Sequence, residues 1–190
     1  AFVVVCDLGA DKLVTYRLDA AAGKLAPVSA VSVAPGAGPR HFAFHPSGAF
    51  AYVINELNAT ITAFRYDGRT GTLDELQTVP TLPADYRGDN ACADIHLSAD
   101  GRFLYGSNRG HDSIAVYRVA ADGTLSLVQI APVHGKHPRN FALSPDGRFL
   151  LAANRDTNDI TVFRRSEEDG TLSGPVHRFV LPKPVCIKFW

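Results

Sequence analysis

The chain has 190 residues, 46% of them hydrophobic, and its 19 Lys and Arg residues balance 19 Asp and Glu residues. This length suits one domain with a sizeable core, and the hydrophobic content argues against intrinsic disorder. Zero net charge argues against a nucleic-acid partner, because phosphate binding needs an excess of basic residues, and no apolar run approaches the roughly 18 residues of a membrane span.

Short strands without helical periodicity are predicted along the whole chain. Residues 1–33 contain three of them, "AFVVVCDL", "KLVTYRLD" and "LAPVSAV". From residue 39 the unit grows to four strands, "PRHFAF", "AFAYVIN", "TITAFRYD" and "LDELQTV". Pro-Ser-Gly separates the first strand from the second and Gly-Thr-Leu the third from the fourth, and such residues favour tight turns. The runs are rich in Val, Ile, Tyr, Phe and Thr, which is typical of strands.

The four-strand unit recurs along the chain. Glycine stands at the first turn of each unit, at positions 48, 101 and 147, and a second glycine series stands at 23, 71, 123 and 170. Four short strands in each unit of about 40–50 residues indicate an all-β protein, a β-propeller with four blade equivalents. The period is too regular for a sandwich and too long for a parallel β-helix. The predicted pieces are residues 1–33, 39–80, 92–131 and 138–181, with "PVCIKFW" at 184–190 as a closing first strand.

Strand direction sorts the loops of such a propeller onto two faces. The turns from strand one to two and from three to four share one face, and we interpret these short turns as structural. The loops from strand two to three and the starts of the first strands share the opposite face. First strands line the central channel, so polar residues there are expected to converge at its mouth. The candidates are Arg40, His41, Glu56, Asp94, Asn108, Arg109, His111 and Arg139, with His96 farther along the strand that carries Asp94.

Several of these candidates have a structural alternative. Asn108 repeats Asn55 and Asn154 in the other units, and such asparagines can simply cap loops through side-chain to backbone hydrogen bonds. Arg40 recurs as Arg139, so a structural salt bridge stays open beside ligand binding. Glu56 occurs in one unit only, which favours a functional role for it.

The sequence predicts neither a metal nor an organic cofactor. His41 and His45 are four residues apart, which on a strand places them about 13 Å from each other, too far to share one ion. His134 and His137 lack a clear third ligand. No glycine-rich phosphate loop precedes a helix, and no nucleophile elbow occurs. Three scattered cysteines, Cys6, Cys92 and Cys186, are typical of reduced thiols in the cytoplasm.

Three segments resemble the propeller-type lactonase family, which includes bacterial 6-phosphogluconolactonases and the fungal carboxy-cis,cis-muconate cyclase. They are "GAGPRHFAFHPSGAFAYVINELNATITAFRYD", "CADIHLSADGRFLYGSNRGHDSIAVYRV" and "HPRNFALSPDGRFLLAANRDTNDITVFR". The resemblance covers essentially the whole chain. It implies a metal-free, seven-bladed propeller of roughly twice this length that hydrolyses 6-phospho-D-glucono-1,5-lactone in the oxidative pentose phosphate pathway.

The resemblance also implies a site made of one histidine, two arginines and a glutamate. The arginines fall on Arg40 of "GPRH" and Arg109 of "SNRG", and the glutamate falls on Glu56 of "NEL". The histidine belongs to the strand before "AFVVVCDLG", where this chain has not yet begun. Glu56 is suited to act as base or acid, and the arginines to hold an oxyanion or a phosphate. His41, Asp94, His96, Asn108, His111 and Arg139 are expected to bind substrate.

Two other functions stay open at this point. One is a cycloisomerase acting on a muconate-type diacid, and the other is a non-catalytic binding scaffold, since the propeller fold hosts many functions. Non-repeating polar residues at one channel mouth favour an enzyme. The chain lacks methionine, begins at a second strand and ends on a first strand. We therefore expect part of a longer protein, an open half-ring that is inactive alone and self-associates through its open blade edges.

Overall fold

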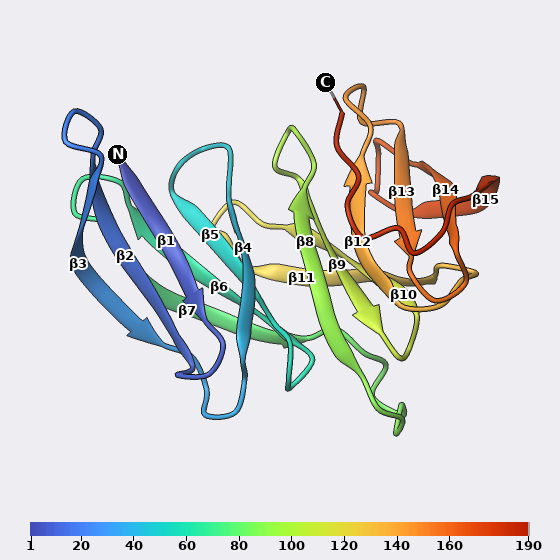
Figure 1. Ribbon diagram of the computed structural model, residues 1–190, viewed down its shortest axis with the longest axis horizontal. Helices are drawn as coiled ribbons and strands as arrows, with labels where there is room; N and C mark the ends of the chain where they lie inside the picture. The colour runs from blue at the N-terminus through green and yellow to red at the C-terminus, as the bar shows by residue number, and fades with distance from the viewer. Residues whose placement is uncertain (190) are drawn as a thin grey trace.

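The computed structural model describes residues 1–189 and forms four antiparallel sheets that follow one another in an arc (Figure 1). Each sheet contains strands that are consecutive in the chain, which is the arrangement of propeller blades. The all-β propeller fold is thereby confirmed. The strands are β1 (Phe2–Asp7), β2 (Lys12–Asp19), β3 (Lys24–Ser32), β4 (Pro39–Phe44), β5 (Phe50–Asn55), β6 (Thr60–Asp67), β7 (Thr72–Pro80), β8 (Ala91–Leu97), β9 (Phe103–Arg109), β10 (Ser113–Val119), β11 (Leu125–Pro132), β12 (Pro138–Leu143), β13 (Phe149–Asn154), β14 (Asp159–Arg165) and β15 (Leu172–Val180).

The first strand of each complete sheet lies on the inside of the arc. β4 packs beside both β1 and β8, and β8 packs beside β12, whereas β7, β11 and β15 are the last strands of their sheets. The first sheet has only three strands, β1 to β3, as the sequence predicts for residues 1–33. The strands of the three complete sheets likewise fall within one residue of the predicted pieces that begin at 39, 92 and 138.

The hydrophobic core lies between neighbouring sheets and is divided into three layers. Tyr52 and Tyr117 are fully buried between the second and third sheets, and Tyr105 and Phe141 between the third and fourth. Leu13 and residues of the second sheet form the layer beside the first sheet. Burial of such large side chains stabilises a fold by about 1.5–3 kcal/mol each, so the stacking of the blades holds the arc together.

The second glycine series lies in tight turns within the blades, and these turns pack against the preceding blade. Gly123 has a φ of 86°, and a Cβ there would lie 2.3 Å from the ring of Phe50 in the preceding blade. Its carbonyl accepts a hydrogen bond of 3.0 Å from the Tyr52 hydroxyl. Gly170 repeats this arrangement with Tyr105 at 2.9 Å. Only glycine combines a left-handed backbone with so close an approach, which explains the glycines at 71, 123 and 170.

A β-bulge interrupts the inner strand of all three complete sheets near its start. In β4 the pairing passes from Pro39 to His41, with Arg40 as the extra residue, and β8 and β12 shift register at their corresponding positions. A bulge changes the direction of neighbouring side chains. Arg40 and His41 consequently line the same cavity on the inside of the arc, although adjacent residues of a regular strand point to opposite faces.

The prediction of a closing strand at 184–190 is wrong for residues 184–189, which form no strand, and Trp190 lies outside the described residues. A strand needs a neighbour to pair its backbone groups, and no strand within residues 1–189 pairs its backbone with this segment. It is held instead by a side chain, because the Ile187 amide donates a 2.7 Å hydrogen bond to Oδ1 of Asn140. β1 pairs with β2 alone, so its inner edge is open in the described part of the chain. Within that same part, no helix has the length and apolar character needed to cross a membrane.

Candidate functional site

Two arginines hold one glutamate where the second and third sheets meet. Arg40 is the bulge residue of β4, Glu56 directly follows β5, and Arg109 is the last residue of β9. Nη1 of Arg40 lies 2.8 Å from Oε2 of Glu56, and Nη2 of Arg109 lies 2.8 Å from Oε1. All three side chains are less than one fifth exposed. The structure thus brings together the three residues for which catalytic roles are predicted.

Backbone carbonyls of β8 fix both guanidinium groups. Nε of Arg40 donates to the carbonyl of Ala93 at 3.0 Å. Arg109 donates from Nε to the Ala91 carbonyl and from Nη2 to the Cys92 carbonyl, at 3.1 and 2.7 Å. The planar fork of arginine suits such multiple acceptors. The two side chains are therefore held in place before any ligand binds, which is the condition for electrostatic preorganisation.

The two arginines decide the ionisation of Glu56. Burial by itself would raise the pKa of Glu56, but hydrogen bonds and charge attraction from Arg109 and Arg40 outweigh burial and lower it. Glu56 is accordingly a carboxylate at neutral pH with both oxygens engaged. A proton acceptor works best when its pKa lies near the working pH, so this environment suits an anchor for the arginines better than a base.

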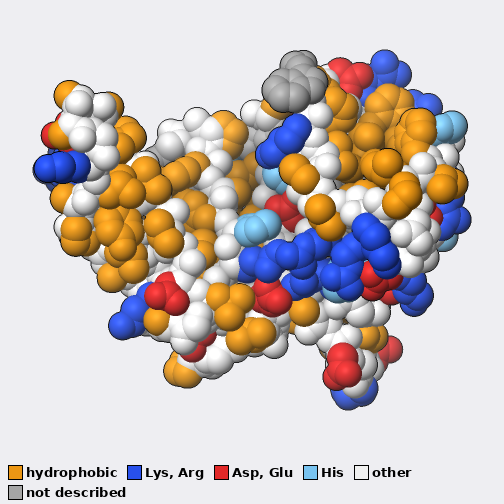
Figure 2. Space-filling view, viewed as in Figure 1, with side chains coloured by type: hydrophobic (Ala, Val, Ile, Leu, Met, Phe, Trp, Pro, Cys, Tyr) orange, Lys and Arg blue, Asp and Glu red, His pale blue; other side chains and the backbone are white. Residues whose placement is uncertain are grey.

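A third arginine adds positive charge that the cluster does not neutralise. Arg139 is the bulge residue of β12 and half-buried, and it forms no ion pair with any of residues 1–189. Burial and the charges of Arg40, Arg109 and Arg155 lower the pKa of Arg139, although Glu56 opposes them. A continuous patch of Lys and Arg side chains crosses the middle of the face shown in Figure 2. The surroundings of Glu56 are thus suited to an anionic ligand.

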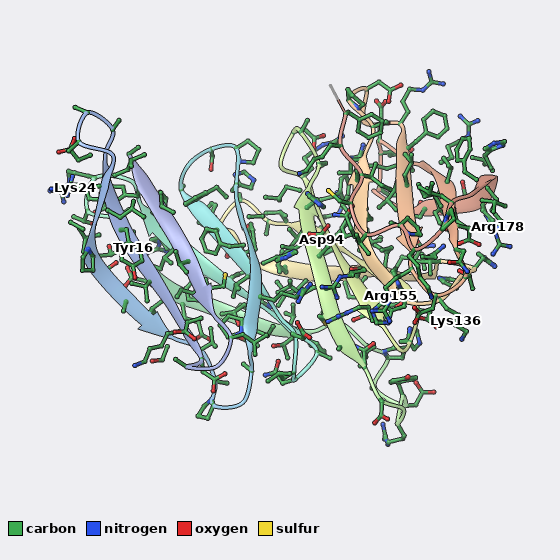
Figure 3. The ribbon with its side chains drawn as sticks, viewed as in Figure 1. Tyr16, Lys24, Asp94, Lys136, Arg155 and Arg178 are labelled. Carbon is green, nitrogen blue, oxygen red and sulfur yellow. The ribbon has the colours of Figure 1, made fainter. Side chains whose placement is uncertain are left out.

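A cavity of about 780 Å³ lies on the inside of the arc. It is bounded by the inner strands and by the C-terminal segment near Cys186. Asp94 lies at the centre of this wall on β8, between β4 and β12 (Figure 3). The polar side chains in the wall are Arg40, His41, Asp94, His96, Ser98, Asn140 and Lys188.

Asp94 connects three of these side chains. Its Oδ1 accepts a hydrogen bond from Nδ1 of His41 at 2.8 Å, and its Oδ2 accepts from Nε2 of His96 at 3.0 Å and from Nδ2 of Asn140 at 2.5 Å. Burial would raise the pKa of Asp94, but the hydrogen bonds from His41 and His96 outweigh it and hold this pKa well below its ordinary value. Asp94 is therefore a fixed negative charge in the wall of the cavity.

Asn108 belongs to the scaffold beneath the arginine cluster. It is fully buried, and its amide nitrogen donates to the Thr81 carbonyl at 2.9 Å and to the Ser113 hydroxyl at 3.2 Å. Its amide oxygen accepts from the Thr81 hydroxyl at 2.8 Å. This is the loop-capping alternative from the sequence, so Asn108 positions the end of β9, where Arg109 follows, and does not face the cavity.

His111 lies apart from the cavity as well. Its Nδ1 is 2.8 Å from the Ser113 hydroxyl, and its ring packs edge-on against Tyr86 with centroids 4.8 Å apart. It borders a separate shallow hollow beside Lys136 and Thr157. The predicted substrate contact of His111 would thus need an extended ligand.

Sequence reasoning missed the link from His41 through Asp94 to Asn140. These residues occupy the same position in three successive repeats, and equivalent positions on neighbouring inner strands lie side by side around the arc. The alignment of the repeats was the signal that could have found the link. Among residues 1–189, no three His, Cys, Asp or Glu side chains are grouped so that they could hold a metal ion.

This chain is similar to known proteins in both sequence and structure. The sequence profile described as "Lactonase, 7-bladed beta-propeller" matches residues 1–189. A 6-phosphogluconolactonase of Bacillus subtilis is 42% identical over 99% of this chain and 54% of that protein. The structure of a protein from Lactobacillus plantarum is similar with a TM-score of 0.94 and 40% identity, over 97% of this chain and 54% of the other. A periplasmic gluconolactonase of Pseudomonas aeruginosa gives 0.93 and 36%, over 98% and 53%. This chain spans about half the length of these relatives.

Proposed function

Because the chain belongs to the seven-bladed β-propeller lactonase family, we propose that it carries the active site of a sugar lactonase, at the Arg40, Glu56 and Arg109 cluster and the adjoining cavity. Water attacks the lactone carbonyl, and the ring oxygen leaves as a hydroxyl group. Negative charge develops on the carbonyl oxygen during the attack, so fixed cationic donors accelerate the reaction. Arg40, which lines the cavity, and the buried Arg109 supply this positive charge, and Glu56 holds both guanidinium groups in place.

The substrate that we propose is 6-phospho-D-glucono-1,5-lactone, the lactone of the oxidative pentose phosphate pathway. The observation that carries this choice is the excess of positive charge. One glutamate neutralises only part of the charge of Arg40 and Arg109, and Arg139 stands beside them without a carboxylate partner among residues 1–189. A phosphate group fits such a site, because guanidinium groups bind it through paired hydrogen bonds. The name of the Bacillus relative supports the same choice.

An unphosphorylated aldonolactone is the second candidate, because the Pseudomonas neighbour is named a gluconolactonase. The two candidates differ in whether Arg139 has a charged partner in the complex. Nucleic acid and membranes are not among the partners we propose. We also propose a cytoplasmic location, which the free thiols of Cys6, Cys92 and Cys186 support.

The test compares both lactones with the wild-type protein and with Arg139→Gln, by following the acid released on ring opening and subtracting the uncatalysed rate. The proposal predicts hydrolysis of the phosphorylated lactone, and a KM for it that Arg139→Gln raises about tenfold or more while the rate with the unphosphorylated lactone changes little. Equal effects of the variant on both lactones would favour the second candidate. Hydrolysis of neither lactone, with cyclisation of a muconate-type diacid instead, would replace the proposal by the cycloisomerase alternative.

A further inference from the structure

The lactonase reaction needs a proton acceptor, and Glu56 is poorly placed to be one. Both of its oxygens bind guanidinium groups at 2.8 Å, and its pKa is lowered by them. The attacking water has to lose a proton as the new bond forms, which usually requires a neutral imidazole or an unpaired carboxylate within hydrogen-bond reach. The wall of the cavity next to Arg40 contains such a group.

His41 follows Arg40 on the bulge of β4, and both side chains line the cavity. The His41 side chain is 45% exposed, so one side of its ring is accessible from the cavity. Its Nδ1 lies 2.8 Å from Oδ1 of Asp94, which is only 6% exposed. Nε2 of His41 has no hydrogen-bond partner among residues 1–189. One ring nitrogen is therefore anchored and the other is accessible.

The hydrogen bond to Asp94 also determines which ring nitrogen of His41 carries the proton. A carboxylate can only accept hydrogen bonds, so Nδ1 of His41 has to be the donor toward Asp94. In the neutral ring the remaining nitrogen, Nε2, then carries a lone pair that points away from Asp94. An imidazole in this tautomer can accept a proton at Nε2, and a buried aspartate stabilises the imidazolium that results.

Asp94 is itself held firmly, which fixes the orientation of the ring. In addition to its two histidine partners it accepts hydrogen bonds from Nδ2 of Asn140 and from the backbone amides of Ile95 and Phe141. These donors come from both β8 and β12. The carboxylate is therefore saturated, and it stays ionised because five donors face it.

We propose that His41, oriented by Asp94, is the general base that activates water in this site. The inference rests on the proposed lactonase function. Nε2 of His41 takes one proton from water while the water oxygen bonds to the lactone carbonyl carbon, and Arg40 at the cavity wall, with the charge of the buried Arg109, stabilises the oxyanion. The tetrahedral intermediate then collapses, the bond between carbonyl carbon and ring oxygen breaks, and the imidazolium returns its proton to the leaving ring oxygen. Atoms and charge balance, and the products are one hydroxy acid and the original neutral His41.

His96 is the natural internal comparison, because it shares Asp94 and lines the same cavity. Its ring packs edge-on against Phe141 with centroids 4.9 Å apart, and it stands two residues farther along β8. His96 is therefore farther than Asp94 from the bulges of β4 and β12, which carry Arg40 and Arg139. We assign to His96 the part of a positioning residue that keeps Asp94 ionised.

The experiment measures lactone hydrolysis by the wild-type protein and by His41→Ala, His96→Ala and His177→Ala, with and without added imidazole. His177 is an exposed residue of β15, the last strand of its sheet, and is the matched control for loss of a surface histidine. The proposal predicts that kcat of His41→Ala falls by about 100-fold or more and that imidazole restores it by about tenfold or more. KM should change little. His177→Ala should behave as wild type.

Three other outcomes would overturn the role of His41 or the proposed function. Wild-type hydrolysis together with a His41→Ala protein that loses less than about threefold in kcat would overturn the role of His41 and leave the lactonase function standing. A large loss without rescue by imidazole, alongside rescue of His96→Ala, would transfer the role to His96 and equally refute the proposal. Absence of lactone hydrolysis in the wild-type protein would refute the proposed function, and the assignment of the base would fall with it.

Discussion

Replacement of Glu56 by glutamine tests whether this carboxylate is the anchor of the two arginines. The variant keeps the size of the side chain and removes its charge. Arg40 and Arg109 would then lie close together with Arg139 and no carboxylate between them. Their hydrogen bonds to the carbonyls of β8 would remain. We therefore expect a folded protein whose arginine cluster is strained by charge repulsion.

The magnitude follows from the burial of the pair. Loss of one partner of a fully buried ion pair costs about 3–5 kcal/mol, whereas an exposed pair contributes only about 0.2–1 kcal/mol. Arg109 is 7% exposed and Glu56 is 17% exposed. An intermediate loss of about 2 kcal/mol in the free energy of unfolding is expected, which corresponds to about 4–8 °C in Tm for a chain of this size. Displacement of the guanidinium groups by a fraction of an ångström should lower kcat by about 10- to 100-fold.

The assay combines urea unfolding with lactonase kinetics, and Glu168→Gln is the matched control. Glu168 lies in an exposed turn of the fourth sheet, so the same change of charge there should alter neither quantity. The reasoning is refuted if Glu56→Gln matches the control in both stability and kcat. A normal stability with a large loss of kcat would show instead that Glu56 acts on the reaction directly, as the base that the sequence suggests.

Three further predictions come from other parts of the structure. Asp94 has a lowered pKa in the folded protein, so its ionised form contributes stability that is present above the unfolded pKa near 4 and is lost as pH falls through the folded value. Urea unfolding should therefore show that the wild type loses stability below about pH 4 and that Asp94→Asn loses less. Parallel curves of stability against pH for the two proteins would contradict this. Gly110 has a φ of 123°, and a Cβ there would lie 2.2 Å from the Asp89 carbonyl oxygen. Gly110→Ala should therefore lower the free energy of unfolding by at least about 1 kcal/mol. An unchanged Tm would be evidence against the geometry of this loop. If the chain self-associates through the open edge of β1, the isolated 190-residue chain should elute in size-exclusion chromatography at a size that grows with its concentration. Elution as a monomer at all concentrations would exclude this self-association.

The blades could be predicted from the sequence because turn residues and strands repeat together. Glycines 48, 101 and 147 mark the first turns, and strands of Val, Ile, Phe and Tyr stand between turns at a regular period. Local preferences thus suffice to place nearly every strand. The cluster of Arg40, Glu56 and Arg109 followed from strand direction and from the resemblance of their motifs to a known family, and in the structure these side chains meet at distances of 2.8 Å.

The parts that could not be predicted depend on contacts between distant segments. Residues 184–189 carry the pattern of a first strand but form none, because strand formation needs a partner in space as well as a suitable sequence. The ionisation of Glu56 depends on two arginines whose distances no sequence spacing gives. The hydrogen bonds of Asp94 cross from β4 to β8 and β12, so only the packing of three blades reveals that His41 has an anchored ring nitrogen and an accessible one.

We propose that this arginine cluster and the cavity beside it open a sugar lactone. The most direct measurement follows the ring opening of 6-phospho-D-glucono-1,5-lactone by NMR at slightly acidic pH, where uncatalysed hydrolysis is slow, with the protein and with its Arg40→Gln variant. We expect a rate that rises in proportion to the concentration of the wild-type protein and falls by about 100-fold or more in the variant. A wild-type rate equal to that of buffer alone, or an Arg40→Gln protein as active as the wild type, would contradict it.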